Sequence, residues 1–424
     1  MPTAPTLKGA VAAPEVFAVG RVDCGMYRRT DGGTTPLAEA VSTLAAAVGS
    51  IDRTRHVPVE EAASRALAEP VAARRDVPHY PRSERDGWAV RSEETAGASE
   101  AEPVELSAGS PPLEPGTASY VHTGSAVPAE ADAVVMIEHV EETPDGIRLT
   151  KPVEAGAYVT PQGTDVEAGE RLYEAGHRLR PGDLGTLKVT GVDAVTAVEP
   201  PTVAVIPTGE ELVQSDPGPG EVVETNGLVG SALVDHWCGR SRYHEVVTDD
   251  AAALATAIER DRDADLIVTS GGSSVGARDV LPGVVADRGE MLVEGLALRP
   301  GHSASVGVVD GTPIAMLPGT PVAALVVAWL LVRPVLARAV GTTAVSPPTV
   351  QAALGWDLES PAGRRSVHGV AIENEDEPVA HRVDRGGLPA LPETDGWLQV
   401  PESTTGISAG ETVTVEQWGA GGCP

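Results

Sequence analysis

Residues 263–279 read DADLIVTSGGSSVGARD, and this stretch decides the fold class. Its uncharged run has the length of a strand buried on both faces, and it ends in a loop of glycine and serine. TVAVIPTGEEL (202–212) and TPIAMLPGTPVAAL (312–325) have the same form. Helical patterns separate the three runs, at 226–237, 251–262 and 280–288. Apolar strands that alternate with helices predict a parallel sheet covered on both faces, a three-layer α/β domain over residues 201–343.

The rest of the 424-residue chain changes character several times. Residues 1–33 form an N-terminal extension, and residues 34–72 have a helical pattern. Short valine-rich runs between prolines and glycines predict β-structure over 73–165. A mixed pattern follows over 166–200, and residues 344–424 alternate as in a small all-β module. The chain is long enough for two to four such units (~100–200 residues each).

The charge of the chain is strongly one-sided. Asp and Glu number 61 against 31 Lys and Arg, which gives a formal net charge of -30. Carboxylate repulsion of this kind is screened over about 3 Å in 1 M salt, so the composition suits a cytoplasmic protein of a halophile. An acidic protein from ordinary salt remains the alternative. Either way, the composition argues against binding to duplex nucleic acid, which needs a basic surface.

Cysteines and histidines predict no metal or disulfide site. The three cysteines, Cys24, Cys238 and Cys423, are scattered and form no C-x-x-C pair. The ten histidines lack metal-ligand spacing, and the N-terminus lacks a secretory pattern. Residues 311–332 carry no charge, which is nearly the length of a membrane span. Prolines and a glycine in the middle predict a strand, a tight loop and a helix instead.

The helix in that window has a clear start signal. Pro321 suits the first helical position, and Thr320 suits the cap before it. We therefore expect no membrane partner.

Three loops follow the apolar strands, and they are the candidate ligand site. They read PTGEEL (207–212), SGGSSVGARD (270–279) and LPGTP (317–321). In α/β sheets, ligands bind outside the carboxyl ends of the strands. Glycine lets the backbone approach an anion, and the serine hydroxyls donate hydrogen bonds. Asp279 ends the second loop and is suited to holding Mg²⁺ against phosphate.

Each of these signals also has a purely structural interpretation. Thr208 and Glu211 fit a capping box at a helix start. Asp249 and Asp250 precede a helix and suit its N-cap. Asp86-Gly87 is a hairpin-turn signal, and Thr123-Gly124 is unremarkable alone.

Ten strings taken together resemble the molybdopterin molybdenumtransferase family, which includes MoeA and the gephyrin E domain. They occur in the family's order, and the resemblance covers roughly Pro36 to Trp418. They are EAASRALAEPV (61–71), DVP (76–78), SERDGWAV (83–90), HTGSAVPAEADAVVMIE (122–138), GTDVEAGE (163–170), PTGEEL (207–212), TDD (248–250), DLIVTSGGSSVGARD (265–279), LRPG (298–301) and LPGTPVAAL (317–325).

The resemblance implies a four-domain subunit in an elongated homodimer. Residues 34–72 and 166–200 would form a split linker domain, and residues 73–165 a β-rich lid inserted into it. An α/β molybdopterin-binding domain (201–343) and a C-terminal small β-barrel (344–424) would follow. The site would form between the lid of one subunit and the α/β domain of the other. Other proteins of the cofactor pathway are further expected partners.

The implied reaction is a step of molybdenum cofactor biosynthesis. Adenylylated molybdopterin, a pterin nucleotide, is hydrolysed to release AMP, and molybdate (or tungstate) is inserted at the dithiolene, with Mg²⁺ as cofactor. Carried over position by position, the metal ligands are Asp249 and Asp279. The catalytic residues are Asp86, Thr123, Asp165 and Glu211, with Asp86 needed most. The substrate-binding residues are Thr208, Gly209, Ser270, Gly271, Gly272, Ser273, Ser274, Gly276, Arg299, His302, Pro318, Gly319 and Pro321.

The sequence departs from the family where the oxyanion is expected. The family's KPGKP segment is Arg299-Pro300-Gly301-His302-Ser303, so Arg and His replace two lysines. Arg keeps the charge, whereas His302 is charged only if its pKa is raised. The family's LPGNP has Thr320 in place of its asparagine. In the terminal module, Gly369 falls where an anion-binding arginine is expected, and a serine expected further on falls near Pro389-Ala390.

These departures keep other functions open. A paralogue of the same fold would bind molybdopterin or the finished cofactor for delivery or regulation, without inserting metal. A non-catalytic dimeric scaffold is another alternative, as is a molybdopterin adenylyltransferase, whose α/β domain is similar but which lacks the lid and the terminal β-module.

Overall fold

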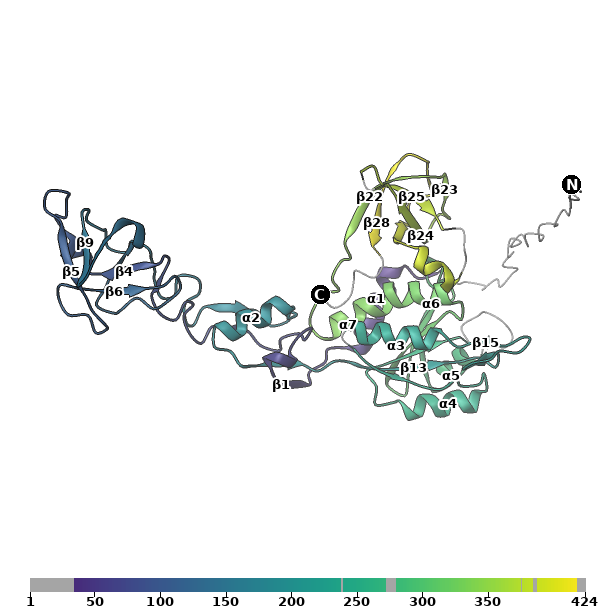
Figure 1. Cartoon of the computed structure of the whole chain (residues 1–424). Helices are drawn as coiled ribbons and strands as arrows, with labels where there is room; N and C mark the ends of the chain where they lie inside the picture. The colour runs from purple at the N-terminus through teal and green to yellow at the C-terminus, as the bar shows by residue number, and fades with distance from the viewer. Residues whose placement is uncertain (1–33, 238, 272–279, 375, 384–386, 418–424) are drawn as a thin grey trace, which may run out of the picture. The chain divides into compact units, whose positions relative to one another are not determined.

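The computed structural model describes residues 34–237, 239–271, 280–374, 376–383 and 387–417 (Figure 1). The expected extension over 1–33 lies outside them. So do Cys238 and Cys423, and the part of the glycine-serine loop from 272 to 279.

A six-stranded sheet forms the centre of the α/β domain. Its strand order is β16-β13-β17-β21-β20-β18. The strands are β13 (Thr202–Pro207), β16 (Arg240–Tyr243), β17 (Leu266–Ser270), β18 (Gly289–Glu294), β20 (Ser305–Val309) and β21 (Thr312–Leu317). The short parallel pair β14 (Leu212–Val213) and β15 (Val222–Val223) forms a separate sheet and follows β13 in the chain.

Helices cover both faces of this sheet, which confirms the three-layer expectation (Figure 1). On one face, Ile206, Ile267 and Ile314 pack with helices α4 and α5. On the other, Val205, Val268 and Ala315 pack with α1, α3 and the α6–α7 segment. The helices are α1 (Leu37–Val48), α3 (Asn226–His236), α4 (Ala251–Arg260), α5 (Leu281–Arg288), α6 (Pro321–Val327), the π-helix η4 (Ala328–Val332) and α7 (Arg333–Ala339).

One edge of the sheet differs from the expected all-parallel arrangement. Strands β16, β13, β17 and β21 are parallel, but β20 runs antiparallel to both of its neighbours, β21 and β18. The reason is local, because Asp310 and Gly311 both adopt positive φ and join β20 to β21 as a tight hairpin. Asp-Gly is a strong signal for such a turn, and it turns the chain back where a crossover helix would have kept the strands parallel.

The uncharged window contains a strand, a loop and a helix, as predicted. Residues Pro321–Ala339 form one apolar helical stretch long enough to cross a membrane, and 72% of it is buried inside the protein. It therefore packs as a core helix. Pro321 begins α6 after Thr320, although the Thr320 side chain makes no capping hydrogen bond.

The linker part has its own small core, centred on Val57, Leu67, Leu179, Leu187 and Val195. Strands from its two halves pair across the inserted lid segment, β1 with β12 and β2 with β11. Its elements are β1 (Thr54–Pro58), η1 (Val59–Glu61), β2 (Val71–Ala72), β11 (Arg171–Tyr173), α2 (Pro181–Val189) and β12 (Ala194–Val198).

The lid is a six-stranded β-structure with strand order β7-β4-β6-β5-β9-β8. The pair β3–β10 stands where the chain enters and leaves it. Its elements are β3 (Arg82–Ser83), β4 (Gly87–Val90), η2 (Ser92–Thr95), β5 (Val104–Ala108), β6 (Thr117–Val121), β7 (Ala133–Met136), η3 (Ile137–His139), β8 (Glu141–Thr143), β9 (Gly146–Leu149) and β10 (Val159–Thr160).

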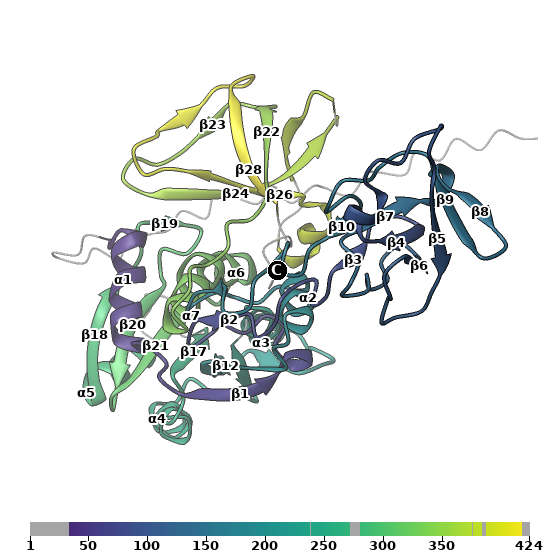
Figure 2. The same ribbon diagram turned by 90° about the vertical axis from the view of Figure 1, so that its left-hand side faces the viewer.

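The C-terminal region is a small closed β-barrel, as expected (Figure 2). The pairing of β24 with β26 closes it, and β19 of the α/β domain adds to β24. The elements are β19 (Leu298–Arg299), β22 (Thr349–Leu354), β23 (Leu358–Glu359), β24 (Arg365–Glu373), β25 (Val379–Arg382), η5 (Leu388–Glu393), β26 (Gly396–Val400), β27 (Gly406–Ile407) and β28 (Thr412–Gln417).

Candidate functional site

Three loops meet at the carboxyl ends of β13, β17 and β21. The Thr208 amide donates to the Ser270 carbonyl oxygen at 2.9 Å, and the Gly271 amide donates to Leu317 at 3.3 Å. A Cβ on Gly319 would lie 3.6 Å from the Gly271 Cα. The structure therefore brings together the first two loops and the start of the third, as the sheet topology predicts.

Gly271 is needed where these loops touch. Its φ is +101°, and a Cβ at this position would lie 2.0 Å from the Thr208 carbonyl oxygen. No side chain fits that space, so the glycine lets the backbones of the first two loops approach each other at the carboxyl ends of the strands.

Several buried polar atoms at this edge have no hydrogen-bond partner among the described residues. They are the hydroxyls of Thr208, Thr269 and Ser270 and one carboxylate oxygen of Asp249. Buried polar atoms are nearly always paired, so each unpaired one needs an explanation. A bound polar ligand provides one for all four. Thr269 carries no motif signal, because within an apolar strand it looks like an ordinary β-branched residue.

Asp249 has the electrostatics of a cation ligand. Burial raises the pKa of its carboxyl group, and the charges of Glu211 and Glu210 raise it further. A carboxylate oxygen that is unpaired and repelled by two further carboxylates suits a positive charge. No group of three or more potential metal ligands occurs within the described residues. Asp279, the other expected ligand, lies outside them.

Gly272, Ser273, Ser274 and Gly276 also lie outside the described residues. The loop positions that can be described are thus Ser270 and Gly271, with Pro318, Gly319 and Pro321 from the third loop. Asn226, which no motif indicated, donates from Nδ2 to the Gly319 carbonyl oxygen at 2.7 Å and fixes that loop.

The capping interpretation is wrong for Thr208 and Glu211 and right for Asp250. No helix begins after Thr208, because the chain turns into β14 instead. Asp250 caps α4, accepting hydrogen bonds from the amides of Ala252 and Ala253, both at 3.0 Å. Asp249 takes no part in that cap, which leaves its carboxylate available.

In the lid, Asp86 and Thr123 lie side by side. Asp86 Oδ1 accepts hydrogen bonds from the Thr123 amide at 2.7 Å and from its hydroxyl at 3.1 Å. These two bonds lower the pKa of Asp86, the amide having the larger effect. Asp86-Gly87 is not a hairpin turn, since Gly87 begins β4. A Cβ on Gly87 would lie 2.0 Å from the Val135 carbonyl oxygen, so close strand contact explains this glycine.

Three aromatic rings, those of Trp88, Tyr120 and His122, form a row next to Asp86. The sequence did not predict this row. Trp88 and Tyr120 meet edge to face at 5.6 Å, and Tyr120 and His122 meet at 5.1 Å. Trp88 and Tyr120 are directly paired across β4 and β6. His122 Nδ1 lies 3.8 Å from Asp86 Oδ1. Tyr120 is 39% exposed, so the row borders solvent beside the carboxylate.

Asp165 is placed differently. Its amide donates to Val77 at 2.9 Å, where the chain returns from the lid to the linker part. Within the described residues no hydrogen bond joins it to Asp86 or Thr123.

A second cavity, of about 820 Å³, lies at the mouth of the barrel and includes Arg299. Arg299 is in register with Ser366 of β24, and Arg382 of β25 is in register with Val370. Because alternate residues of a strand share a face, Arg299, Ser366, His368 and Arg382 lie on one face of the sheet. Asp357 and Glu359 also line this cavity, but among the described residues neither of them forms an ion pair with Arg299 or Arg382.

The two histidines beside this cavity are neutral at ordinary pH. Burial lowers the pKa of His302, as do Arg364 and Arg299. Burial, Arg299 and Arg382 lower the pKa of His368, whose buried Nε2 has no partner among the described residues. His302 therefore does not restore the charge of the lysine that it replaces.

Gly369 is not among the residues that line the barrel cavity. A Cβ there would point at Thr394, 3.3 Å from its Cγ2, and at Trp397, which belongs to the core. The neighbouring residue His368 faces the cavity instead. The arginine position expected at Gly369 therefore stays a prediction, and His368 is the residue of this pair that reaches the cavity.

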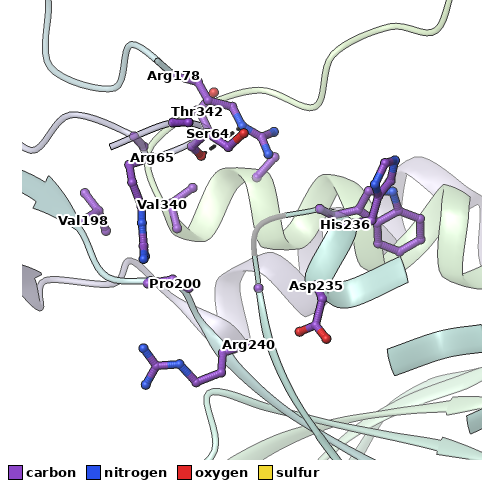
Figure 3. Close-up of a pocket in the computed structure, with 15 residues that line it drawn as sticks. Ser64, Arg65, Arg178, Val198, Pro200, Asp235, His236, Arg240, Val340 and Thr342 are labelled. Carbon is purple, nitrogen blue, oxygen red and sulfur yellow. Dashed lines mark hydrogen bonds between the residues drawn. The ribbon is translucent and has the colours of Figure 1, made fainter. Parts of the chain in front are cut away.

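A third cavity, of about 440 Å³, lies between the linker part and the α/β domain (Figure 3). None of the site residues expected from the sequence lines it.

Comparisons with known proteins agree with this architecture. Residues 35–191 match the MoeA N-terminal region (domain I and II), 204–338 a probable molybdopterin binding domain, and 351–418 the MoeA C-terminal region (domain IV). Two solved structures of the molybdopterin biosynthesis MoeA protein from Pyrococcus horikoshii superpose with TM-scores of 0.78 and 0.76. They are 32% and 28% identical, and the alignments cover 91% of this chain and 99% and 100% of theirs.

Curated relatives match over similar lengths. Molybdopterin molybdenumtransferase 2 of Mycobacterium tuberculosis is 32% identical over 386 residues, covering 85% of this chain and 94% of the relative. The molybdopterin molybdenumtransferase of a Nostoc species is 29% identical over 402 residues, covering 90% and 92%. The chain therefore belongs to the molybdopterin molybdenumtransferase family, and it is a transferase of molybdenum cofactor biosynthesis.

Proposed function

We propose that this protein cleaves adenylylated molybdopterin with Mg²⁺ as cofactor, releases AMP, and inserts molybdate or tungstate at the dithiolene. The observation that carries the proposal is the group of unpaired buried polar atoms at the sheet edge, namely Asp249 and the hydroxyls of Thr208, Thr269 and Ser270. Hydroxyl donors beside a carboxylate that needs a cation suit a phosphoanhydride with its metal.

Each part of the site has a distinct role in this proposal. The strand-end loops bind the phosphates, because Gly271 lets the first two loops approach each other and the hydroxyls of Thr208 and Ser270 donate hydrogen bonds. Asp249 and Asp279 would hold Mg²⁺, with Glu211 beside them. A Mg²⁺ ion held there would supply positive charge against the phosphate oxygens. Pro318, Gly319 and Pro321 shape the neighbouring wall.

In the lid, Asp86 is the catalytic base. Thr123 keeps it ionised, so it accepts a proton from the water that attacks the phosphoanhydride phosphorus. The P–O bond to AMP breaks, and the terminal phosphate stays on molybdopterin. The rings of Tyr120 and His122 supply an apolar border for a planar substrate ring next to this carboxylate.

The barrel cavity is the proposed oxyanion site. Arg299 and Arg382 supply two fixed cations, and the guanidinium fork matches a tetrahedral oxyanion. His368 faces the same cavity and contributes an imidazole N–H donor. Arg382 thus supplies charge that His302 and Gly369 do not.

The decisive experiment measures AMP release and metal insertion together. Purified full-length protein is given adenylylated molybdopterin, Mg²⁺ and molybdate or tungstate, with Asp86→Asn as the inactive control. Oxyanion-dependent AMP release that Asp86→Asn loses by ~10²–10⁴-fold supports the transferase reaction. No release with any oxyanion contradicts it.

The weakened charge of the oxyanion site favours a second candidate. Neutral His302 and His368 leave two fixed cations in the cavity. A paralogue that binds the pterin nucleotide without inserting metal fits that state too. In the same assay, tight substrate binding without oxyanion-dependent AMP release would favour the paralogue.

We further propose a homodimer in which the lid of one subunit completes the α/β site of the other. Two inactive variants, Asp86→Asn and Asp249→Asn, test this arrangement. Mixed and allowed to exchange subunits, they form heterodimers with one intact site, and up to about a quarter of wild-type activity returns if subunits exchange randomly. Sites built within one subunit would give no recovery.

We also place the protein in the cytoplasm of a halophile. The formal net charge of -30 supports this, because unscreened repulsion destabilises such a fold. Melting temperature should rise steadily with KCl toward molar concentrations. A melting temperature that does not depend on KCl would contradict the halophile assignment.

A further inference from the structure

The cavity between the linker part and the α/β domain is lined by three chain regions (Figure 3). Residues Ala63–Ala66, Arg178 and Val198 come from the linker part, and Pro200 follows it in the chain. Asp235–Trp237 and Gly239–Arg240 come from the end of α3 and the start of β16, and Ala337, Val340 and Thr342 from the end of α7 and the residues after it. None of them belongs to the site proposed above.

Arginines from both sides converge on this cavity. Arg65 and Arg178 reach it from the linker part, and Arg240 reaches it from the α/β domain. A smaller adjoining hollow shares Arg65 and Arg240 and adds Arg55. In Figure 3 the Arg65 side chain runs from the linker part toward Pro200, with Arg240 beyond it. These two hollows thus bring four guanidinium groups together, although the protein as a whole has a formal net charge of -30.

The carboxylates nearby form no ion pair with Arg65 or Arg240 within the described residues. Asp235 lines the cavity with its negative charge, and it accepts hydrogen bonds from the amide and hydroxyl of Ser241 at 2.8 and 2.9 Å. Glu199 lines the adjoining hollow and lies 3.7 Å from Arg53. Within the described chain, neither Arg65 nor Arg240 forms an ion pair.

The geometry around Arg178 fixes one wall. Its Nε donates to the Ser64 carbonyl oxygen at 3.3 Å, and Ser64 itself has a φ of +65°. Burial lowers the pKa of Arg178, which shows that its charge is partly withdrawn from water. The carboxyl ends of α3 and α7 reach the cavity and offset part of the positive charge. Their partial charges, about half a unit each, add to the full negative charge of Asp235, and the sum is still smaller than the charge of three guanidinium groups.

We propose that this cavity is a second anion site, which binds a phosphate group carried by a small molecule. Guanidinium groups bind phosphate through paired N–H donors, and Arg65 and Arg240 would share one phosphate across the junction. The volume of about 440 Å³ admits inorganic phosphate or a nucleoside monophosphate. Because the anion would bridge the linker part and the α/β domain, binding stabilises that junction.

The test uses the full-length protein and two probes, inorganic phosphate and AMP, titrated calorimetrically at constant ionic strength. The double variant Thr208→Ala/Ser270→Ala disables the strand-end site. Because the barrel cavity is itself a proposed oxyanion site, Arg382→Gln is added to this background, and phosphate or AMP binding that persists then belongs to the second site. Adding Arg65→Gln or Arg240→Gln should weaken this remaining binding by about tenfold or more. Arg171→Gln, an exposed arginine of β11 paired with Glu174, is the matched control.

The two probes separate the possible sources. Tighter binding of AMP than of phosphate assigns a nucleotide, and equal or weaker binding assigns the phosphate group alone. Binding that Arg65→Gln and Arg240→Gln leave unchanged would overturn the proposal, as would the absence of binding in the Thr208→Ala/Ser270→Ala/Arg382→Gln protein. Arg240→Gln alone decides the matter if Arg65→Gln does not fold. The readout is binding and not activity. A negative result here would therefore say nothing against the proposed transferase reaction.

Discussion

Asp86 and Thr123 are joined by two hydrogen bonds to a single carboxylate oxygen, one from the Thr123 amide at 2.7 Å and one from its hydroxyl at 3.1 Å. Both donors favour the ionised carboxylate, so the pKa of Asp86 is lowered. The lid thus presents a carboxylate that is already deprotonated at any pH where the enzyme is expected to work.

Thr123→Val removes the hydroxyl donor and keeps the amide donor. The pKa of Asp86 should rise, but only partly, because the amide makes the larger contribution. If ionised Asp86 is the base, the acidic limb of the kcat/KM profile moves to higher pH, with little change on the plateau. Thr123→Ser retains the hydroxyl and should keep the wild-type limb. If the acidic limb of the kcat/KM profile does not shift in Thr123→Val, the ionisation of Asp86 does not produce that limb.

Asp249→Asn should stabilise the metal-free protein at neutral pH. The pKa of Asp249 is raised, so its ionised form costs folding free energy above that pKa and the cost disappears as pH falls through it. We expect a melting temperature about 2–4 °C higher at neutral pH, no gain at acid pH, and loss of the stabilisation by Mg²⁺.

The matched control for that variant is Asp250→Asn. Asn caps a helix about as well as Asp, so this variant should melt normally and keep its response to Mg²⁺. If Asp249→Asn still responds to Mg²⁺ like wild type, Asp249 is not a metal ligand.

His368→Arg and Gly369→Arg should have opposite effects. His368 faces the cavity with Arg299 and Arg382, so a permanent charge there should tighten molybdate binding about tenfold. At Gly369 the new side chain would meet Thr394 and Trp397, so the protein should lose ~1–3 kcal/mol of stability. Equilibrium binding and thermal melts measure both effects. Tighter binding in Gly369→Arg would support the arginine position expected there.

Gly87→Ala tests the close strand contact in the lid. The added Cβ would lie 2.0 Å from the Val135 carbonyl oxygen, so pairing of β4 with β7 must open, at a cost of ~1–3 kcal/mol. Limited proteolysis should then cut within the lid. Gly185→Ala in α2 meets no atom within 4 Å and should instead stabilise by ~0.5–1 kcal/mol. Equal melting of both variants would contradict the steric argument.

Much of the α/β domain was predictable because its strands are continuous apolar runs. DLIVTS and TPIAML contain β17 and β21, and Pro321 marks the start of α6. The antiparallel edge was missed because an apolar run gives no strand direction. Only the Asp310-Gly311 turn carried that information.

The site was less predictable than the fold, because it depends on the direction that the chain takes and on the surroundings of each side chain. Thr208 and Glu211 satisfy the spacing of a capping box, but spacing does not reveal that the chain enters β14. Which face of β24 a residue occupies depends on register, and a shift of one residue exchanges Gly369 for His368. Arg382 has no motif, and the neutrality of His302 follows from burial and neighbouring charges. Chain direction, strand register and burial all depend on the tertiary structure, so the local sequence does not predict them.

The insertion of the lid into the linker part also sets an order of folding. Strand β1 pairs Thr54 with Val198 and Pro58 with Ala194, so it leaves the ribosome long before its partner β12. Meanwhile the lid can fold, and β3–β10 then holds Ser83 next to Val159. The finished lid brings the two halves of the linker part together and shortens the loop that β1 and β12 must close. A lid that folds slowly therefore leaves β1 as an unpaired edge in the nascent chain, where it is exposed to aggregation.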